Sequence, residues 1–159
     1  MTISPPAAPN GDIKGHHDQN VGYALAHLHR LFHDRLSEAL ADTGLHLGHV
    51  LVLATLRARR ELNGESTLTQ TQLAQITGIE KSSLVLFLDA LERDGWVERR
   101  RHPRDRRAHI IHLTADGAKR FELVGRDLHI RERQMLSPLS AAEEASMLAM
   151  IQRLIAHLS

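Results

Sequence analysis

Residues 97–114 of the chain read VERRRHPRDRRAHIIHLT. Two short runs of strand-forming residues flank a tip at residues 103–106, and this pattern is typical of a β-hairpin. Residues 99–107 hold six arginines and one aspartate, a local charge of +5, whereas the whole chain carries only +1. A hairpin that concentrates positive charge in this way is expected to face an anion, and the phosphate backbone of nucleic acid is the leading candidate.

Two short helices joined by a tight turn precede this hairpin. Thr69 and Gln72 have the spacing of a capping box, which opens a helix that stops at Gly78. A second helix begins near Glu80, carries leucines at helical spacing on one face, and ends at Gly95. Together they predict a helix-turn-helix.

Longer apolar helices are predicted on both sides of this unit, over residues 21–44, 47–60, 115–136 and 140–158. Thr114 is expected to cap the third of them, and the fourth opens with a second capping box. The first and last helices are too apolar to stand alone on a small domain. We therefore expect them to pack on a second copy of the chain.

These elements and the residues that fill them resemble the MarR (multiple antibiotic resistance regulator) family of winged helix-turn-helix proteins. Asp105-Arg106-Arg107-Ala108, followed by Leu113-Thr114, is similar to the family's wing motif. The segment 91–97 (LERDGWV) resembles the end of the family's recognition helix. Either fragment alone is a weak signal, but both at this separation, after a capped helix-turn-helix, form a strong one.

The resemblance implies a mainly α (α+β) fold, a winged helix-turn-helix with N- and C-terminal dimerisation helices. Residues 1–20 are rich in proline and glycine and are expected to form a flexible arm. Residues 21–158 would form the MarR-type domain. Within it, 21–63 and 115–158 would mostly be dimerisation helices, and 66–114 the DNA-binding lobe.

The resemblance further implies a homodimeric transcription regulator, most simply a repressor, that binds a pseudo-palindromic operator in double-stranded DNA. Two copies on a two-fold axis would read half-sites one helical turn, roughly 34 Å, apart. Release would follow from binding of a small molecule, aromatic or acidic in character. The residues expected to contact DNA are Lys81, Ser82, Ser83, Leu86, Arg99, Arg101, Arg104, Asp105, Arg106 and Arg107. Among them, Asp105 is expected to hold Arg107 and the hairpin turn in shape rather than to touch phosphate.

The recognition helix departs from the family at Val85 and Leu86, where threonine and arginine are frequent. Apolar side chains can contact the thymine methyl group but cannot form bidentate bonds to guanine. Specificity could then rest on the wing and on DNA shape, or Val85, Leu86 and Phe87 could be partly buried. We favour exposure for Leu86 and partial burial for Phe87.

The chain contains twelve histidines, and they suggest two further hypotheses. The resemblance places an effector site at Tyr23, His27, Leu31, His46, His49 and Leu53. Alternatively, His29 and His33, four residues apart on one helix, could share a zinc ion with His46 or His49. The simpler interpretation of each histidine is a surface or helix-end residue, and we assign no metal site.

Several classes of protein are not expected. No phosphate-binding loop, nucleophile elbow or cysteine is present, so we assign no catalytic residue and no cofactor. No apolar run is long enough for a membrane span, and the N-terminus lacks the pattern of a secretory signal, which favours a cytoplasmic protein. A helical protein-interaction module without specific DNA binding stays open as an alternative, because Val85 and Leu86 are apolar.

Overall fold

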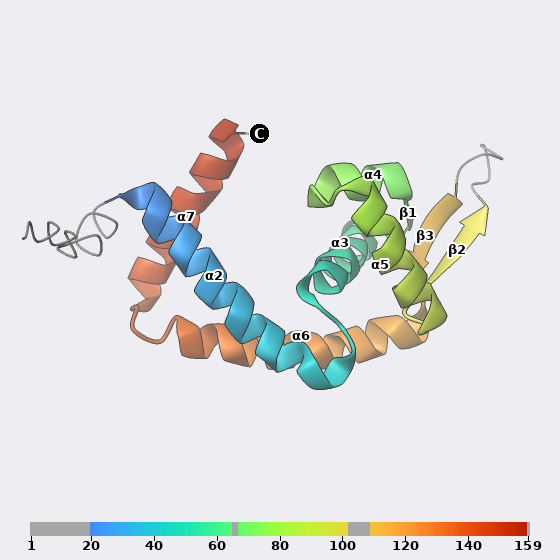
Figure 1. Ribbon diagram of the computed structural model, residues 1–159, viewed down its shortest axis with the longest axis horizontal. Helices are drawn as coiled ribbons and strands as arrows, with labels where there is room; N and C mark the ends of the chain where they lie inside the picture. The colour runs from blue at the N-terminus through green and yellow to red at the C-terminus, as the bar shows by residue number, and fades with distance from the viewer. Residues whose placement is uncertain (1–19, 65–66, 102–108, 159) are drawn as a thin grey trace, which may run out of the picture. The chain divides into compact units, whose positions relative to one another are not determined.

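The computed structural model describes residues 20–64, 67–101 and 109–158 (Figure 1). Its helices are α2 (Val21–Leu40), a 3₁₀ turn (Ala41–Thr43), α3 (Leu47–Asn63), α4 (Gln70–Thr77), α5 (Lys81–Arg93), α6 (Ala115–Met135) and α7 (Ala141–Leu158). Its strands are β1 (Thr67–Thr69), β2 (Val97–Arg101) and β3 (His109–Leu113). The chain forms two compact units, one ending at Arg35 and the other beginning at Leu36.

Local signals in the sequence set the helix ends as predicted. The Thr69 hydroxyl accepts a hydrogen bond from the Gln72 amide at 3.2 Å, and the Gln72 side chain accepts one from the Thr69 amide at 2.9 Å. The same reciprocal pair joins Ser140 and Glu143 before α7. Gly78 ends α4 with φ 67°, a left-handed conformation that favours glycine. Both predicted capping boxes are therefore confirmed.

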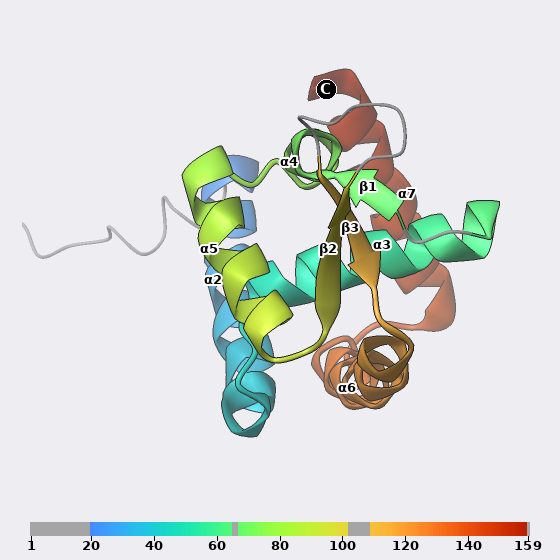
Figure 2. The ribbon, with the colours of Figure 1, turned by 90° about the vertical axis from the view of Figure 1, so that its right-hand side faces the viewer.

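The strands form an antiparallel sheet in the order β1–β3–β2. Val97 pairs with Leu113 at one end of the hairpin and Arg101 with His109 at the other, which confirms the two predicted strands. Figure 2 shows β2 and β3 side by side, with α3 behind them. The strand β1 was not predicted, because a strand of three residues shows no alternating pattern and depends on pairing with β3.

One aliphatic core joins the helix-turn-helix to α3 and the sheet. Leu84 and Leu88 of α5 and Leu73 of α4 are fully buried, as are Leu56 of α3 and Ile111 of β3. Burial of a leucine or isoleucine contributes about 1.5–3 kcal/mol each, so this core fixes α5 relative to the hairpin.

The two ends of the described chain keep their apolar side chains exposed. In α7 no residue is buried, and Leu148, Met150, Leu154 and Leu158 are among its exposed side chains. Along α2, several large apolar side chains are likewise exposed. Among the described residues no single helix is long and apolar enough to cross a membrane; one bent pair, Val21–Thr43 with Leu47–Leu62, passes that test by length and composition only.

Candidate nucleic-acid interface

The helix α5 has one face in the core and one in solvent. Leu84, Leu88 and Leu91 pack inward. The opposite face exposes Lys81, Ser82, Val85, Leu86 and Asp89. This helix is the second of the helix-turn-helix, so its exposed face is the surface that can enter a major groove.

The apolar residues on α5 are placed as the sequence analysis favoured. Leu86 is 68% exposed and Val85 38% exposed. Phe87 is half-buried against the start of α3, with its ring centroid 4.5 Å from that of His46 and 5.3 Å from that of His49. The exposed face of α5 is consequently short of polar side chains that could read base edges.

The first turn of α5 is capped by an acid that the sequence analysis did not assign a role. The Glu80 carboxylate accepts hydrogen bonds from the backbone amides of Ser82 and Ser83, and also from the Ser82 hydroxyl. These bonds lower the pKa of Glu80, so it stays charged at the positive end of the helix. The hydroxyl of Ser82, a predicted DNA contact, already donates its proton to Glu80 within the chain.

Arg99, one of the predicted DNA contacts, is turned toward α5. Its guanidinium donates to Asp89 at 2.6 Å and to Glu92 at 2.5 Å, and its backbone amide donates to Glu92 at 2.9 Å. Desolvation opposes the charge of Arg99, but the two carboxylates outweigh it and raise its pKa. Arg99 therefore ties the wing strand β2 to α5. The sequence could not show this, because its partners lie seven and ten residues away.

The rest of the wing is only partly described. Arg100 is paired with Glu98 on the same strand, and Arg101 is exposed at the end of β2. The predicted contacts Arg104, Asp105, Arg106 and Arg107 lie outside the described residues. Arg101 of β2 pairs with His109 of β3, and these two residues flank that segment in the sequence.

His46 and His49 form the cap of α3. Each imidazole Nδ1 accepts a backbone hydrogen bond, His46 from Gly48 at 3.2 Å and His49 from His46 at 3.3 Å. The rings stack with their centroids 3.7 Å apart, and His49 is 6% exposed. The spacing of three between His46 and His49 is that of a capping box, and the structure uses it as one.

The buried cap predicts a loss of stability in acid. Burial and the neighbouring His46 lower the pKa of His49 from 6.5 to about 4, while Asp94 opposes them. Between pH 6.5 and 4 the unfolded chain binds a proton at this histidine and the folded chain does not. The free energy of unfolding therefore decreases as the pH is lowered, by at most about 1.4 kcal/mol per pH unit. Above pH 6.5 this effect vanishes.

His49→Gln tests this, because glutamine keeps the acceptor at the same helix position but does not titrate. Urea denaturation at pH 7.0, 5.5 and 4.5 should show a shallower loss of stability in the variant than in wild type. The exposed His157→Gln is the matched control. Parallel curves for wild type and His49→Gln would contradict the assignment.

Comparison with known proteins identifies the family to which this architecture is similar. The MarR family model matches residues 47–109, which span α3, the helix-turn-helix and β2. The multiple antibiotic resistance protein MarR of Escherichia coli is 29% identical over 136 residues, covering 82% of this chain and 88% of that protein. The chain belongs to the MarR family.

Two further relatives agree with this identification. The HTH-type transcriptional regulator PecS of Dickeya dadantii is 36% identical over 110 residues, 67% of this chain and 63% of that one. The structure of the transcriptional repressor CouR bound to a 23-mer DNA duplex has a TM-score of 0.81 at 27% identity, covering 91% of this chain and 99% of that one. As a member of the MarR family, the chain is a DNA-binding transcription regulator, and the predicted winged-helix fold is confirmed.

The residues predicted to bind an effector are divided between the two units of the chain. Leu53 is fully buried in the core, and His46 and His49 are committed to the cap of α3. Tyr23, His27 and Leu31 lie exposed on α2, in the unit that ends at Arg35. The sequence alone could not distinguish a leucine that faces a ligand from one that lies in the core.

The zinc alternative has no support in this MarR-family chain. His29 and His33 lie with their ring centroids 6.2 Å apart. Across residues 20–64, 67–101 and 109–158, no group of three histidine or acidic side chains is arranged to hold a metal ion.

Proposed function

We propose that this MarR-family protein is a homodimeric repressor that binds a pseudo-palindromic operator and is released by a small molecule. The observation that carries the proposal is that one core holds both α5, whose outer face is exposed, and the arginine-rich strand β2 of the hairpin. The helix suits the major groove, and the arginines suit the phosphates and the minor groove beside it.

The homodimer is supported by the exposed apolar side chains of α2 and α7. Leu154 is 47% exposed and Leu158 82% exposed in a single chain, although both belong to an amphipathic helix of a globular protein. A second copy of the chain, related by a two-fold axis, would bury both helices and place two α5 helices toward one face of DNA. We place the protein in the compartment that contains the DNA, the cytoplasm.

Readout by this dimer would rest strongly on charge and DNA shape. Val85 and Leu86 can contact thymine methyl groups only, and Lys81 is the cation at the start of α5. Arginines of the wing would then supply much of the affinity, with a preference for a narrow, A·T-rich minor groove.

Selection of binding sites from random double-stranded DNA tests this function. Purified full-length protein should enrich a pseudo-palindrome with half-sites about one helical turn apart, and light scattering should give twice the mass of one chain. Enrichment of no sequence above background, with only salt-sensitive non-specific binding, would reject the operator function. It would favour instead a helical interaction module that has lost specific DNA binding.

A further inference from the structure

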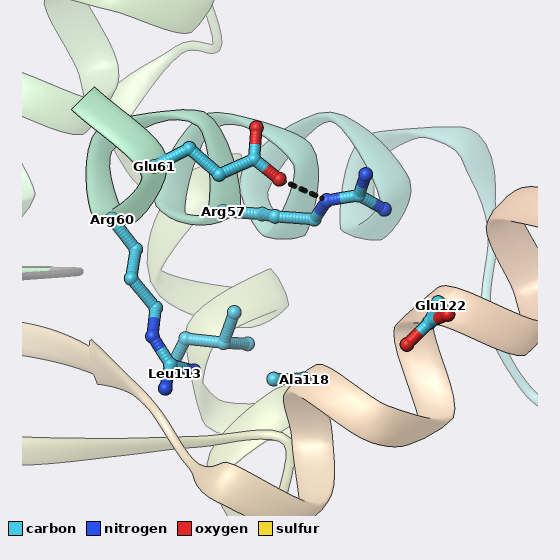
Figure 3. A pocket seen from close by; sticks show the side chains of 6 residues that line it. All are labelled: Arg57, Arg60, Glu61, Leu113, Ala118 and Glu122. Atoms are coloured by element: carbon cyan, nitrogen blue, oxygen red, sulfur yellow. Dashed lines mark hydrogen bonds and ion pairs between the residues drawn. The ribbon is translucent and has the colours of Figure 1, made fainter. Parts of the chain in front are cut away.

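A cleft of about 480 Å³ opens between α3, the end of β3 and the first turns of α6 (Figure 3). It lies within the unit that begins at Leu36 and shares no residue with the predicted effector site. Its size is that of a site for a small organic ligand. The residues that line it are Arg57, Arg60, Glu61, Leu113, Ala118 and Glu122.

Both acids of the cleft are engaged by arginines on their own helices. Glu61 accepts a hydrogen bond from Arg57 Nε at 2.9 Å. Glu122 accepts one from Arg126 Nη2 at 2.6 Å. Of the four charged residues in the lining, Arg57 and Glu61 are thus paired with each other. Glu122 is neutralised by Arg126, which does not line the cleft.

Arg60 differs from the other charged residues of the cleft. Within the described part of the chain its guanidinium makes no ion pair or side-chain hydrogen bond. Figure 3 shows it extending away from α3, and Leu113 lines the same cleft. A guanidinium in this position offers two parallel donors, which match a carboxylate in bidentate geometry.

The remaining walls are suited to an apolar body. Leu113 and Ala118 present methyl groups at the base of the cleft, and the Arg57 side chain runs toward α6 (Figure 3). Glu61 accepts a hydrogen bond from Arg57 Nε, and the two terminal nitrogens of Arg57 form no ion pair or hydrogen bond with another described side chain. The lining therefore combines an apolar base, one uncommitted cation and a second guanidinium with donors to spare.

We propose that this cleft binds an apolar monocarboxylate, held by Arg60, and that it is the effector site of the regulator. The second clause rests on the proposed function, whereas the first does not. The charge of the lining suits a monoanion, because Arg60 is the one cation left after Arg57 pairs with Glu61 and Arg126 with Glu122. A neutral amide of the same shape would lose the ion pair with Arg60.

The cleft is joined to the DNA-binding elements through its base. Leu113 is the last residue of β3, and the next residue, Thr114, caps α6 and donates its hydroxyl to the Gly95 carbonyl at 2.8 Å. Gly95 is the second residue after α5, which ends at Arg93. A ligand wedged between α3 and this junction changes the position of the wing relative to α5, and with it the fit to DNA.

Calorimetric titration with 2-naphthoate tests the site in the absence of DNA. Wild-type protein should bind 2-naphthoate and should bind 2-naphthamide at least about tenfold more weakly, because the amide lacks the charged hydrogen bonds. Arg60→Ala should weaken 2-naphthoate binding by about the same factor. Arg131→Ala, an exposed arginine on α6 outside the cleft, should change nothing.

A second readout places the ligand. Methyl resonances of Leu113 should shift on addition of 2-naphthoate in wild type but not in Arg60→Ala. The site is overturned if 2-naphthoate does not bind at millimolar concentration, if the amide binds equally well, or if Arg60→Ala leaves both affinity and the Leu113 shifts unchanged.

A DNA-binding assay with and without 2-naphthoate separates this site from the proposed function. Loss of DNA affinity in wild type, but not in Arg60→Ala, supports the effector role. Binding of 2-naphthoate without any change in DNA affinity keeps the site and rejects its role as effector site. DNA binding by a protein that ignores 2-naphthoate rejects the site and leaves the DNA-binding function intact.

Discussion

Gly117→Ala is expected to lower the free energy of unfolding by about 3 kcal/mol, the upper range for inserting a methyl group into packed structure. A β-carbon at Gly117 would lie 2.2 Å from the Trp96 carbonyl oxygen and 2.9 Å from the Trp96 carbonyl carbon. Both are backbone atoms, so no side-chain rotation can relieve the clash. The α6 helix would have to move away from the turn that joins α5 to β2.

That movement would disrupt several contacts together. Thr114 caps α6 and also donates to the Gly95 carbonyl, and the Thr114 amide donates to the Trp96 carbonyl at 3.1 Å. The Arg120 guanidinium lies 3.8 Å from the centre of the Trp96 ring. Because this junction sets where the wing leaves the recognition helix, we expect Gly117→Ala to weaken DNA binding as well.

Thermal and urea denaturation check the stability change, which should lower the Tm by roughly 6–12 °C for a domain of this size. Gly125→Ala, two turns further along α6, is the matched control. A β-carbon there meets only Arg57 Nη1 at 3.8 Å, so helix propensity should make this variant neutral or more stable by up to about 1 kcal/mol. Equal stabilities of the two variants would contradict the close approach at Gly117.

Replacement of Arg104, Arg106 and Arg107 by alanine is expected to reduce DNA affinity by about 100-fold or more near 0.1 M salt. These residues lie outside the described residues, but β2 and β3 lead directly into the segment that holds them. Each lost phosphate contact should also reduce the slope of log affinity against log salt by about 0.9. The slope should therefore fall by about 2–3 in the triple variant.

Electrophoretic mobility shift at several salt concentrations measures both quantities. The triple variant Lys119→Ala, Arg126→Ala and Arg131→Ala removes the same charge from exposed positions on α6 and should leave the slope close to that of wild type. Arg99→Ala is a second contrast: affinity should fall, because Asp89 and Glu92 lose their partner, while the salt slope stays unchanged. An intact affinity and slope in the wing variant would reject the proposed role of the wing.

Features that depend on a few neighbouring residues could be predicted from the sequence. The capping boxes at Thr69 and Ser140, the glycine stop at Gly78 and the paired strands around the arginine tip all follow from local hydrogen bonds and backbone preferences. The periodic leucines of α5 identified its buried face, because helical spacing is itself local.

The surroundings of the residues expected to bind an effector depend instead on contacts that are remote in sequence. The family resemblance suggested that Leu53 faces a ligand. The packing of α3 against the sheet and α5 places it in the core instead. His46 and His49 could bind a ligand or cap a helix, and their edge-on ring contacts with Phe87 from another helix favour the cap. Burial is decided by neighbours that are remote in sequence, so spacing alone could not choose.

By itself, the sequence determined the helix-turn-helix, the arginine hairpin after it and the family, because each depends on residues within one or two turns. Only the tertiary structure decided which charges are free to act. It directs Arg99 to Asp89 and Glu92 and leaves Arg60 without a protein anion among the described residues at a cleft formed by α3, β3 and α6. Ion pairs and clefts form between elements distant along the chain, so they exist only once the core has fixed those elements against one another.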